Sequence, residues 1–371
     1  MNILILALDV DLQRNRGDST HVNELSAGLR ELGHAVRLVT GTSPENVPLG
    51  LEHETRRSST LGQILRGRSL AAKWADVIYE RRGSPKVSWV ISRLTGVPFV
   101  LEVNGVLDDE ASHLSTSRES WSRWWIRRRM INDSAKVVAV SAGVQAQLRS
   151  AYNLDLEKIA VVPNGANTAI FQPENRDKSR SILGLKPDDK LVCFVGNLVW
   201  WQGVDLLLEA IAQLVPNDRQ VKLLVVGDGP DLESLKGQAR ALGIGDHVRF
   251  EGSVSNSRIP RYIISSDVCV APFRRGRRAS PIKIFEYLAC GKPVVTSDID
   301  EVGQFVRDIR GGLVVNPDSA DDLASAILQL FSDPSEAVAM GARGRAVVAI
   351  SYSWQETARR VASILSLARQ T

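Results

Sequence analysis

The feature that most constrains this chain is an alternation of short apolar runs with amphipathic segments, which begins near the N-terminus and later restarts. Apolar runs of this length predict strands, and the amphipathic segments between them predict helices. In the first half we expect strands at residues 3–8, 36–40, 77–80, 99–103, 137–140 and 159–162, and helices at 21–32, 86–94 and 142–150. Strands joined by helices run parallel, so this half is predicted to be an α/β doubly wound sheet.

A stretch rich in turn-forming residues at 163–173 precedes the second pass of the alternation. There we expect strands at 191–195, 221–226, 248–250, 268–271, 293–296 and 313–315, and helices at 205–214, 232–242, 259–265, 281–289 and 320–331. A chain of 371 residues exceeds the size at which one core stops growing, so two domains are expected, with the linker near 164–173. A final helix at 354–368 follows no new strand, and the pattern allows it to pack on either domain.

Charge and cysteine usage restrict the function classes. The net charge of +4 suits an anionic ligand or a membrane surface, whereas a nucleic-acid reader shows a denser basic stripe, so no nucleic-acid partner is expected. Cys193, Cys269 and Cys290 have no close partner in the sequence, which predicts neither a disulfide framework nor a metal site and fits the reducing cytoplasm. The first eight residues lack the basic lead of a signal peptide, and no run of 18 apolar residues predicts a membrane span.

One run in the second half suits an anion beside a hydroxyl group. Ser280 can cap a helix, Pro281 suits its first position, and Gly291 can end it in a left-handed turn. The free amides at such a helix start attract anions, and Glu286 is placed to accept hydrogen bonds from neighbouring hydroxyls. A nucleotide sugar carries both groups, although a well-capped helix with an ordinary surface glutamate has the same pattern.

Two further junctions between a strand and a helix are rich in glycine. Gly196 and Gly203 flank the first junction, and Gly227 and Gly229 lie in the second. Glycine permits a ligand to approach the backbone closely, but each junction alone is also typical of a tight turn. Three such junctions in one predicted sheet favour a site for phosphate or sugar.

In the first half, candidate polar residues follow the strand at 99–103. Alternation places Glu102 and Asn104 on one face at the carboxyl end of this strand. Asn104 can position a hydroxyl but cannot act as a base, and a turn made by Asn104 and Gly105 is the structural alternative. Glu102 or Glu110 is a candidate acceptor contact. A lone helical histidine such as His21 is more typical of the core or of a cap.

Several motifs together resemble the retaining glycosyltransferases of family 4. They are GDSTHV at 17–22, LGHAV at 32–36, VSAGV at 140–144, VPNG at 162–165, GVD at 203–205, GDGP at 227–230, VRFEG at 248–252 and EYLACGKPV at 286–294. The resemblance covers nearly the whole chain. Each motif alone is weak, and the set is specific.

This resemblance implies a GT-B fold of two Rossmann-like domains that face each other across a cleft. It implies an acceptor-binding domain of residues 1–166 with a returning helix at 352–371, and a domain of residues 174–351 that binds a nucleotide diphosphate sugar. Polysaccharide or cell-envelope assembly, with a glycan or lipid-linked acceptor, is the implied setting. The resemblance further implies that the sugar is transferred with retention, that a donor phosphate oxygen takes the acceptor's proton, and that neither a metal nor another cofactor is required.

The resemblance and the residue patterns together give the candidate site residues. The donor residues are Gly17, Gly196, Asn197, Gln202, Gly227, Gly229, Phe250, Gly252, Arg278, Ser280, Pro281, Ile282, Lys283, Ile284 and Glu286, with the base near Phe250 and the ribose on Glu286. Asp18 and Glu110 are assigned to the acceptor, and Asn104, Glu102 and Lys283 to catalysis.

Three positions depart from the family pattern. Many members carry arginine at Asn197, lysine at Gln202 and glutamate at Arg278. One charge pair near 4 Å is worth about 4 kcal/mol at an effective dielectric constant of 20, so two missing cations should matter. We hypothesise that positive charge is relocated to a basic set near the same leaving group: Arg274, Arg275, Arg277, Arg278 and Lys283. The alternative for the basic set is a solvated surface loop. The alternatives for the function are an inactive protein that binds nucleotide sugar or a partner, and a GT-B epimerase or hydrolase.

A segment rich in tryptophan and arginine at residues 121–131 bears on where in the cell the protein works. On a helix, Trp121, Trp124, Trp125 and Ile131 share about one third of the surface, and arginines flank them. Such a face suits the headgroup layer of an anionic membrane. A tryptophan stripe also packs well against a sheet, so core packing is the competing interpretation.

Overall fold

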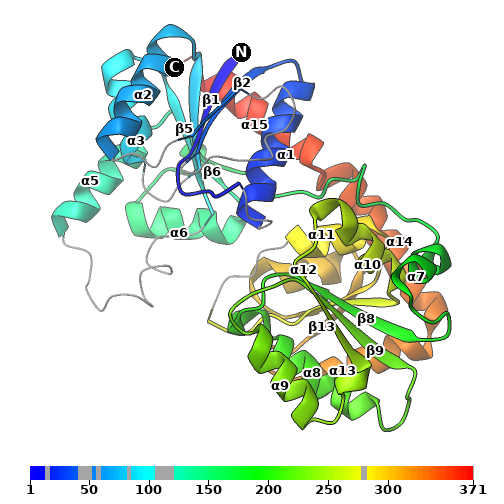
Figure 1. The fold of residues 1–371 in the computed structure, drawn as a ribbon. Helices are drawn as coiled ribbons and strands as arrows, with labels where there is room; N and C mark the ends of the chain where they lie inside the picture. The colour runs from blue at the N-terminus through cyan, green and yellow to red at the C-terminus, as the bar shows by residue number, and fades with distance from the viewer. Residues whose placement is uncertain are drawn as a thin grey trace. The chain divides into compact units, whose positions relative to one another are not determined.

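The computed structural model describes residues 1–12, 17–40, 52–55, 60–81, 85–104, 121–276 and 282–370. The chain divides into two compact units (Figure 1). The first unit comprises Met1–Asn164 and Trp354–Thr371, and the second comprises Gly165–Ser353. These divisions lie close to the boundaries expected at residues 166 and 352.

The first unit is built on a parallel sheet, as predicted. Its strand order is β3-β2-β1-β4-β5-β6-β7. The strands are β1 (Asn2–Ala7), β2 (Ala35–Thr40), β3 (Glu52–Thr55), β4 (Val77–Arg81), β5 (Phe99–Val103), β6 (Lys136–Ala139) and β7 (Ile159–Val161). The order reverses between β1 and β4, and doubly wound sheets bind ligands at the carboxyl ends of the strands beside such a reversal.

Helices cover this sheet on both faces. They are α1 (Gly17–Glu31), α2 (Thr60–Lys73), α3 (Lys86–Thr95), α5 (Trp121–Asn132), α6 (Ala142–Tyr152) and α15 (Trp354–Ala368). Figure 1 shows α15, in red, beside α1, in blue, and the two share one apolar core with the sheet. Gly28 permits this approach, because a Cβ atom there would lie 2.7 Å from the Cβ atom of Ala358. The end of the chain therefore belongs to the first unit.

The second unit repeats the design with the strand order β10-β9-β8-β11-β12-β13. Its strands are parallel and reverse their order between β8 and β11. The strands are β8 (Lys190–Val195), β9 (Val221–Val226), β10 (Val248–Gly252), β11 (Val268–Ala271), β12 (Val294–Ser297) and β13 (Gly312–Val315). The helices are α7 (Arg176–Leu183), α8 (Val204–Leu214), α9 (Leu232–Ala241), α10 (Ile259–Ser265), α11 (Ile282–Ala289), α12 (Asp300–Asp308), α13 (Ala320–Ser332) and α14 (Pro334–Ser351).

The alternation predicted the main strands, but it did not predict five elements of the structure: β3, α2, α7, α12 and α14.

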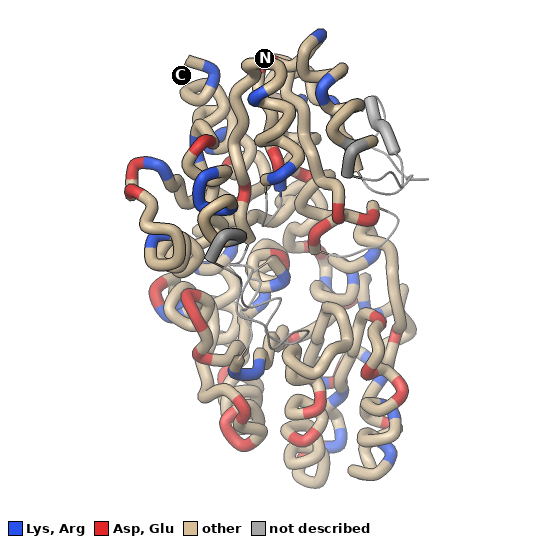
Figure 2. The backbone as a smooth tube through the Cα atoms, turned by 90° about the vertical axis from the view of Figure 1, so that its left-hand side faces the viewer, with Lys and Arg blue, Asp and Glu red and all other residues tan. Residues whose placement is uncertain are grey.

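Figure 2 shows basic and acidic residues interspersed along the backbone of both units. Within the described ranges, no helix is both long enough and apolar enough to cross a membrane.

Candidate active site

A lysine amine lies against the end of the central strand β8. Lys283 is the second residue of α11, and its Nζ lies so close to Gly196 that a Cβ atom on Gly196 would collide with it. Nζ donates a hydrogen bond of 2.6 Å to Oε1 of Gln202 and lies 4.1 Å from the ring centroid of Phe194. The amine thus occupies the carboxyl end of β8, at the reversal of strand order where such sheets bind ligands.

Burial makes this amine easier to deprotonate than an ordinary lysine. The loss of water around Nζ lowers the pKa of Lys283 to about 7, and the nearby Glu286 carboxylate opposes this shift only in part. Among the described residues, no carboxylate forms an ion pair with Lys283, and its hydrogen-bond partner there is the neutral amide of Gln202. A buried cation with a neutral partner is stabilised when an anion binds beside it.

The glycines of the two junctions allow neighbouring loops to pack backbone against backbone. The amide of Gly227 donates to the carbonyl oxygen of Gly252 at 2.8 Å. A Cβ atom on Gly227 would collide with the carbonyl oxygen of Gly196, and one on Gly229 with that of Leu198. Close contact between the loops after β8 and β9 therefore explains Gly227 and Gly229 without a ligand, whereas Gly196 provides the space for Lys283.

The start of α11 carries the other predicted donor residues. Ile282 is half-buried, whereas the side chain of Ile284 lies in the apolar core at 0% exposure, so Ile284 can reach a ligand only through its backbone amide. Glu286 is 8% exposed. The first amides of α11 have no partner within the helix and point toward its N-terminal end. Ser280, Pro281 and Arg278 lie outside the described residues.

The described members of the predicted basic set divide into two groups. Arg274 pairs with Asp205 and, at 3.1 Å, with Asp318, and the Nε atom of Arg275 lies 3.6 Å from Asp318. Carboxylates already pair with these two arginines, so Arg274 and Arg275 are weaker candidates for the diphosphate than an unpaired cation. Lys283 is the described member that lies at the β8 junction, and Arg277 and Arg278 lie outside the described residues.

The remaining predicted donor residues of the second unit lie near the same edge of the sheet. Asn197 is exposed directly after Gly196, and Gln202 accepts the hydrogen bond from Lys283. Phe250 is half-buried and packs against the core at the end of β10, while Gly252 has a left-handed φ of 70° and open space where a Cβ atom would lie. Parallel strands end at one edge, so the residues that follow β8, β9 and β10 share that edge.

The first unit holds a buried carboxylate in a polar cluster. Glu102 of β5 is 0% exposed. Its Oε2 atom lies 2.9 Å from Nε2 of His21 and accepts a hydrogen bond of 2.6 Å from the hydroxyl of Tyr79. Its Oε1 atom lies 3.3 Å from Nε of Arg81. Nδ1 of His21 lies 2.8 Å from Oδ1 of Asn164.

The partners of Glu102 keep it ionised. Burial alone would raise its pKa, but His21, Arg81 and the Tyr79 hydroxyl together lower the pKa of Glu102 to about 2. Burial beside this carboxylate raises the pKa of Tyr79 well above its ordinary value. A carboxylate with no exposed surface and three partners cannot contact an acceptor, so the structure corrects the predicted role of Glu102. It is a positioning residue.

The other predicted residues of the first unit are more accessible. Asn104 is exposed directly after the last residue of β5, and Gly17 is exposed at the start of α1. Asp18 is half-buried, and its Oδ1 accepts a hydrogen bond of 2.9 Å from the amide of Ser19. Glu110 lies outside the described residues.

On the predicted tryptophan face, some side chains pack against the first unit and others are exposed. Trp124 donates from Nε1 to the carbonyl oxygen of Ala151 at 2.9 Å and stacks on Tyr152, so core packing is correct for this side chain. Trp125 and Ile126, in contrast, are 45% and 57% exposed. Arg128 donates to the carbonyl oxygen of Tyr152 at 2.8 Å. The side chain of Trp121 lies outside the described part.

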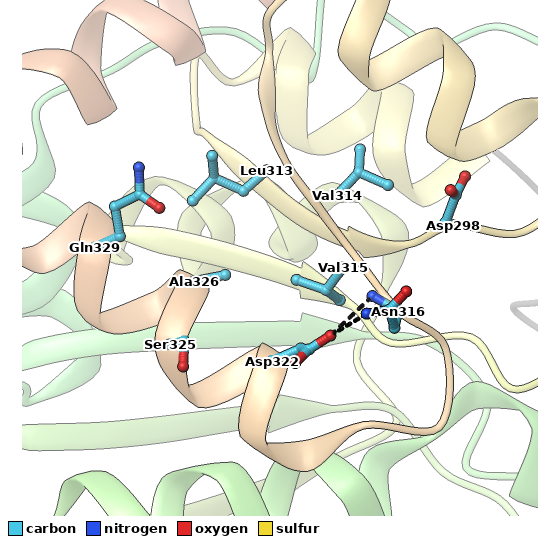
Figure 3. A pocket seen from close by; sticks show the side chains of 9 residues that line it. All are labelled: Asp298, Leu313, Val314, Val315, Asn316, Asp322, Ser325, Ala326 and Gln329. Carbon is cyan, nitrogen blue, oxygen red and sulfur yellow. Dashed lines mark hydrogen bonds between the residues drawn. The ribbon is translucent and has the colours of Figure 1, made fainter.

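The second unit also contains a cavity of about 330 Å³ beside β13 and α13 (Figure 3). It is lined by Asp298, Leu313, Val314, Val315, Asn316, Asp322, Ser325, Ala326 and Gln329. Asp322 accepts a hydrogen bond of 2.6 Å from Nδ2 of Asn316, and Asp298 pairs with Arg307 at 2.8 Å. The lining holds two carboxylates and no lysine or arginine, so it repels a diphosphate, and Lys283 remains the better donor candidate.

Family models match both units. The model described as Glycosyltransferase Family 4 matches residues 16–170, and the model described as Glycosyl transferases group 1 matches residues 175–347. A GDP-mannose-dependent alpha-(1-6)-phosphatidylinositol monomannoside mannosyltransferase of Mycobacterium tuberculosis is 32% identical over 258 residues, which cover 66% of this chain and 66% of that protein. A D-inositol 3-phosphate glycosyltransferase 2 of Catenulispora acidiphila is 26% identical, over 94% of this chain and 90% of its own length.

The alignment with the corresponding mannosyltransferase of Mycolicibacterium smegmatis spans 65% of that protein, slightly less than two thirds. Among solved structures, HepE of Anabaena in complex with UDP matches with a TM-score of 0.80 at 21% identity, over 99% of this chain and 100% of HepE. WaaG, a glycosyltransferase involved in lipopolysaccharide biosynthesis, matches with a TM-score of 0.77 at 16% identity, over 99% of this chain and 100% of WaaG. These similarities show the shared GT-B fold.

Proposed function

This chain belongs to the family-4 glycosyltransferases, and on that basis we propose that it transfers a sugar from a nucleotide diphosphate sugar to a glycan or lipid-linked acceptor. Retention of configuration and a role in polysaccharide or cell-envelope assembly are parts of the proposal. The observation that carries it is the position of Lys283, whose amine lies on Gly196 at the carboxyl end of β8 with a neutral hydrogen-bond partner.

Lys283 and the start of α11 bind the leaving diphosphate in this proposal. Departure of the sugar places negative charge on the diphosphate, and donors already in position stabilise that charge more than they stabilise the intact donor. The amides of Ile282, Lys283 and Ile284 add the positive end of the helix dipole. This charge is supplied by the chain itself, so the proposed reaction requires no resident metal or other cofactor. Glu286 accepts hydrogen bonds from the ribose.

The acceptor side uses position rather than a protein base. In the proposed reaction the acceptor oxygen attacks the face of the sugar from which the diphosphate leaves. A diphosphate oxygen then takes the acceptor's proton, so no bond forms to the protein. The exposed amide of Asn104 can orient a hydroxyl and cannot titrate, which fits a positioning role. Asp18 and Gly17 at the start of α1 remain the proposed contacts of acceptor and donor.

We also propose that the enzyme works at the cytoplasmic face of a membrane. Trp125 and Ile126 expose apolar surface on α5, and Arg129 beside them is exposed as well. This combination suits the headgroup region of an anionic bilayer. The reducing compartment is supported by Cys193, Cys269 and Cys290, which are all free and buried.

The experiment is a screen of UDP-, GDP- and ADP-sugars for thermal stabilisation, followed by release of nucleoside diphosphate with cell-envelope extract as the acceptor source. A donor at 100 times its dissociation constant adds about 2.7 kcal/mol to stability. We expect stabilisation by one class of donor, its loss in Lys283→Ala, and its retention in Lys236→Ala, which alters an exposed lysine on α9. Stabilisation with no turnover would support the inactive alternative, and no stabilisation by any donor would contradict both.

A further inference from the structure

The two segments that connect the units run side by side. The chain passes from the first unit to the second after Asn164 and returns after Ser353. At this point the amide of Ala166 donates to the carbonyl oxygen of Tyr352 at 2.8 Å, and Ala166 forms a parallel bridge with Ser353. A motion of one unit relative to the other must bend both segments together.

His21 contacts both segments on the side of the first unit. Its Nδ1 atom lies 2.8 Å from Oδ1 of Asn164, the last residue before the first crossing. Its ring meets the ring of Trp354, the first residue after the second crossing, edge to face at 5.0 Å between centroids. His21 is 3% exposed, so water competes little for these contacts. Thr357 adds a second tie, with a hydrogen bond of 3.0 Å from its hydroxyl to the carbonyl oxygen of Pro163.

The histidine is itself fixed to the sheet. Its Nε2 atom lies 2.9 Å from Oε2 of Glu102, which Tyr79 and Arg81 hold from the adjacent strand β4. Both ring nitrogens thus face oxygen atoms, which determines the orientation of the ring. One side chain connects the buried strand β5 to each of the two places where the chain leaves and re-enters the first unit.

We infer that His21 is a positioning residue that clamps both connecting segments to the first sheet, so that the units hinge beyond Asn164 and before Trp354. Hinges are short stretches that absorb the change in backbone angles while the elements on either side stay rigid. The clamp confines bending to the paired segment around Ala166 and Ser353. This inference goes beyond the proposed transfer reaction, and its principal tests need no turnover.

The first test measures the spread of distances between the units. The native cysteines are buried, so new cysteines at the exposed positions Leu94 and Val338 can carry spin labels, one in each unit. In His21→Gln the amide nitrogen of glutamine can still donate a hydrogen bond to Glu102, but the contact with Asn164 is lost. We expect the distribution of distances between the two labels to widen about twofold. Asn164→Ala should widen it similarly, whereas Asn164→Asp keeps an acceptor oxygen and should retain the wild-type width.

The second test is hydrogen exchange of the connecting segments. We expect the amides of residues 164–166 and 352–354 to exchange about tenfold faster in His21→Gln and Asn164→Ala, with amides in β4 and β5 unchanged. Donor affinity should stay close to that of the wild type because Lys283 and the start of α11, which bind the diphosphate in the proposal, lie in the second unit, while kcat falls. Unchanged distance width and unchanged exchange in Asn164→Ala would overturn the clamp. That outcome leaves the transfer reaction untouched, because the reaction is read from donor binding and product release.

Discussion

Each unit carries a charged side chain that is shielded from water near its sheet, and the two have opposite surroundings. Glu102 is fully buried, whereas Lys283 is half-buried. Glu102 in the first unit is surrounded by His21, Arg81 and the Tyr79 hydroxyl, which lower its pKa to about 2 in spite of burial. Lys283 in the second unit has a neutral amide as its hydrogen-bond partner, and burial lowers its pKa to about 7. The cost of removing the charge from water is compensated by partners around Glu102, and only partly compensated around Lys283.

The difference distinguishes a charge that stabilises the fold from a charge that is suited to bind a ligand. A fully partnered buried ion holds its neighbours in place and is costly to break. A buried cation without an anionic partner is costly as it stands, and a ligand's anion can lower that cost. The comparison therefore places Glu102 in the architecture of the first unit and supports the proposal that Lys283 binds the donor in the second.

The largest expected effect is on the stability of the first unit. Glu102→Ala leaves His21 and Arg81 without their buried carboxylate, and we expect a loss of about 3–5 kcal/mol in the free energy of unfolding. Urea unfolding followed by hydrogen exchange in β4 and β5 measures it, with Glu31→Ala on the exposed end of α1 as the matched control. A loss no greater than that of the control would show that the cluster does not stabilise the unit.

The pH dependence of stability has a defined sign for Glu102. Its pKa is lower in the folded state, about 2 compared with 4.5, so its contribution is complete above about pH 4.5 and is lost as the pH falls toward 2. Glu102→Gln should therefore flatten the acid part of the stability curve of the first unit. A curve parallel to that of the wild type would contradict the low pKa.

The next effect concerns the donor. Lys283→Ala removes the proposed cation at the diphosphate, and we expect donor affinity to fall about 100-fold, close to the value of one charged hydrogen bond. Calorimetric titration measures it. In the same background, Gln202→Lys returns a cation to the position that many relatives use, and should recover about tenfold of the loss. Equal affinity in the wild type and Lys283→Ala would remove Lys283 from the site.

The smallest expected effect concerns the membrane. Trp125→Ser with Ile126→Ser should reduce binding to anionic liposomes several-fold, because exposed apolar surface is lost while the packed face of α5 is unchanged. Trp124→Ala tests packing instead and should lower stability, since Trp124 is bonded to Ala151. Liposome flotation that is the same for the double variant and the wild type would exclude this face as the contact.

The sheets could be predicted from the sequence because buried parallel strands produce continuous apolar runs. Helix α14 could not, since Gly341 and Gly344 interrupt its interior and weaken the helical signal. Its packing requires both glycines. A Cβ atom on Gly341 would collide with the carbonyl oxygen of Gly291, and one on Gly344 with the side chain of Leu288. Such long-range contacts leave no local pattern.

The candidate site was predictable to a similar extent. The helix start predicted at residues 280–281 placed Lys283 beside the expected diphosphate, but alternation could not distinguish the buried Glu102 from the exposed Asn104. The burial of Glu102 depends on β4, where Arg81 is its register partner, and on His21 from a distant helix. The alternation of β4 could have identified Tyr79 and Arg81 as neighbours of β5, had the strand order been known. The contact between Lys283 and Gly196 likewise depends on the tertiary structure and could not be predicted from the sequence.

The most direct test of the central claim is proton uptake on binding of a nucleotide diphosphate sugar, whose esterified diphosphate does not titrate near neutral pH. With a pKa of about 7, most Lys283 amines are neutral at pH 8, and a bound diphosphate should protonate them. Calorimetry in buffers of different ionisation enthalpy should find close to one proton taken up at pH 8, little uptake at pH 6, and none in Lys283→Ala at either pH. Equal uptake by the wild type and Lys283→Ala, or no uptake at pH 8 with binding intact, would contradict the account.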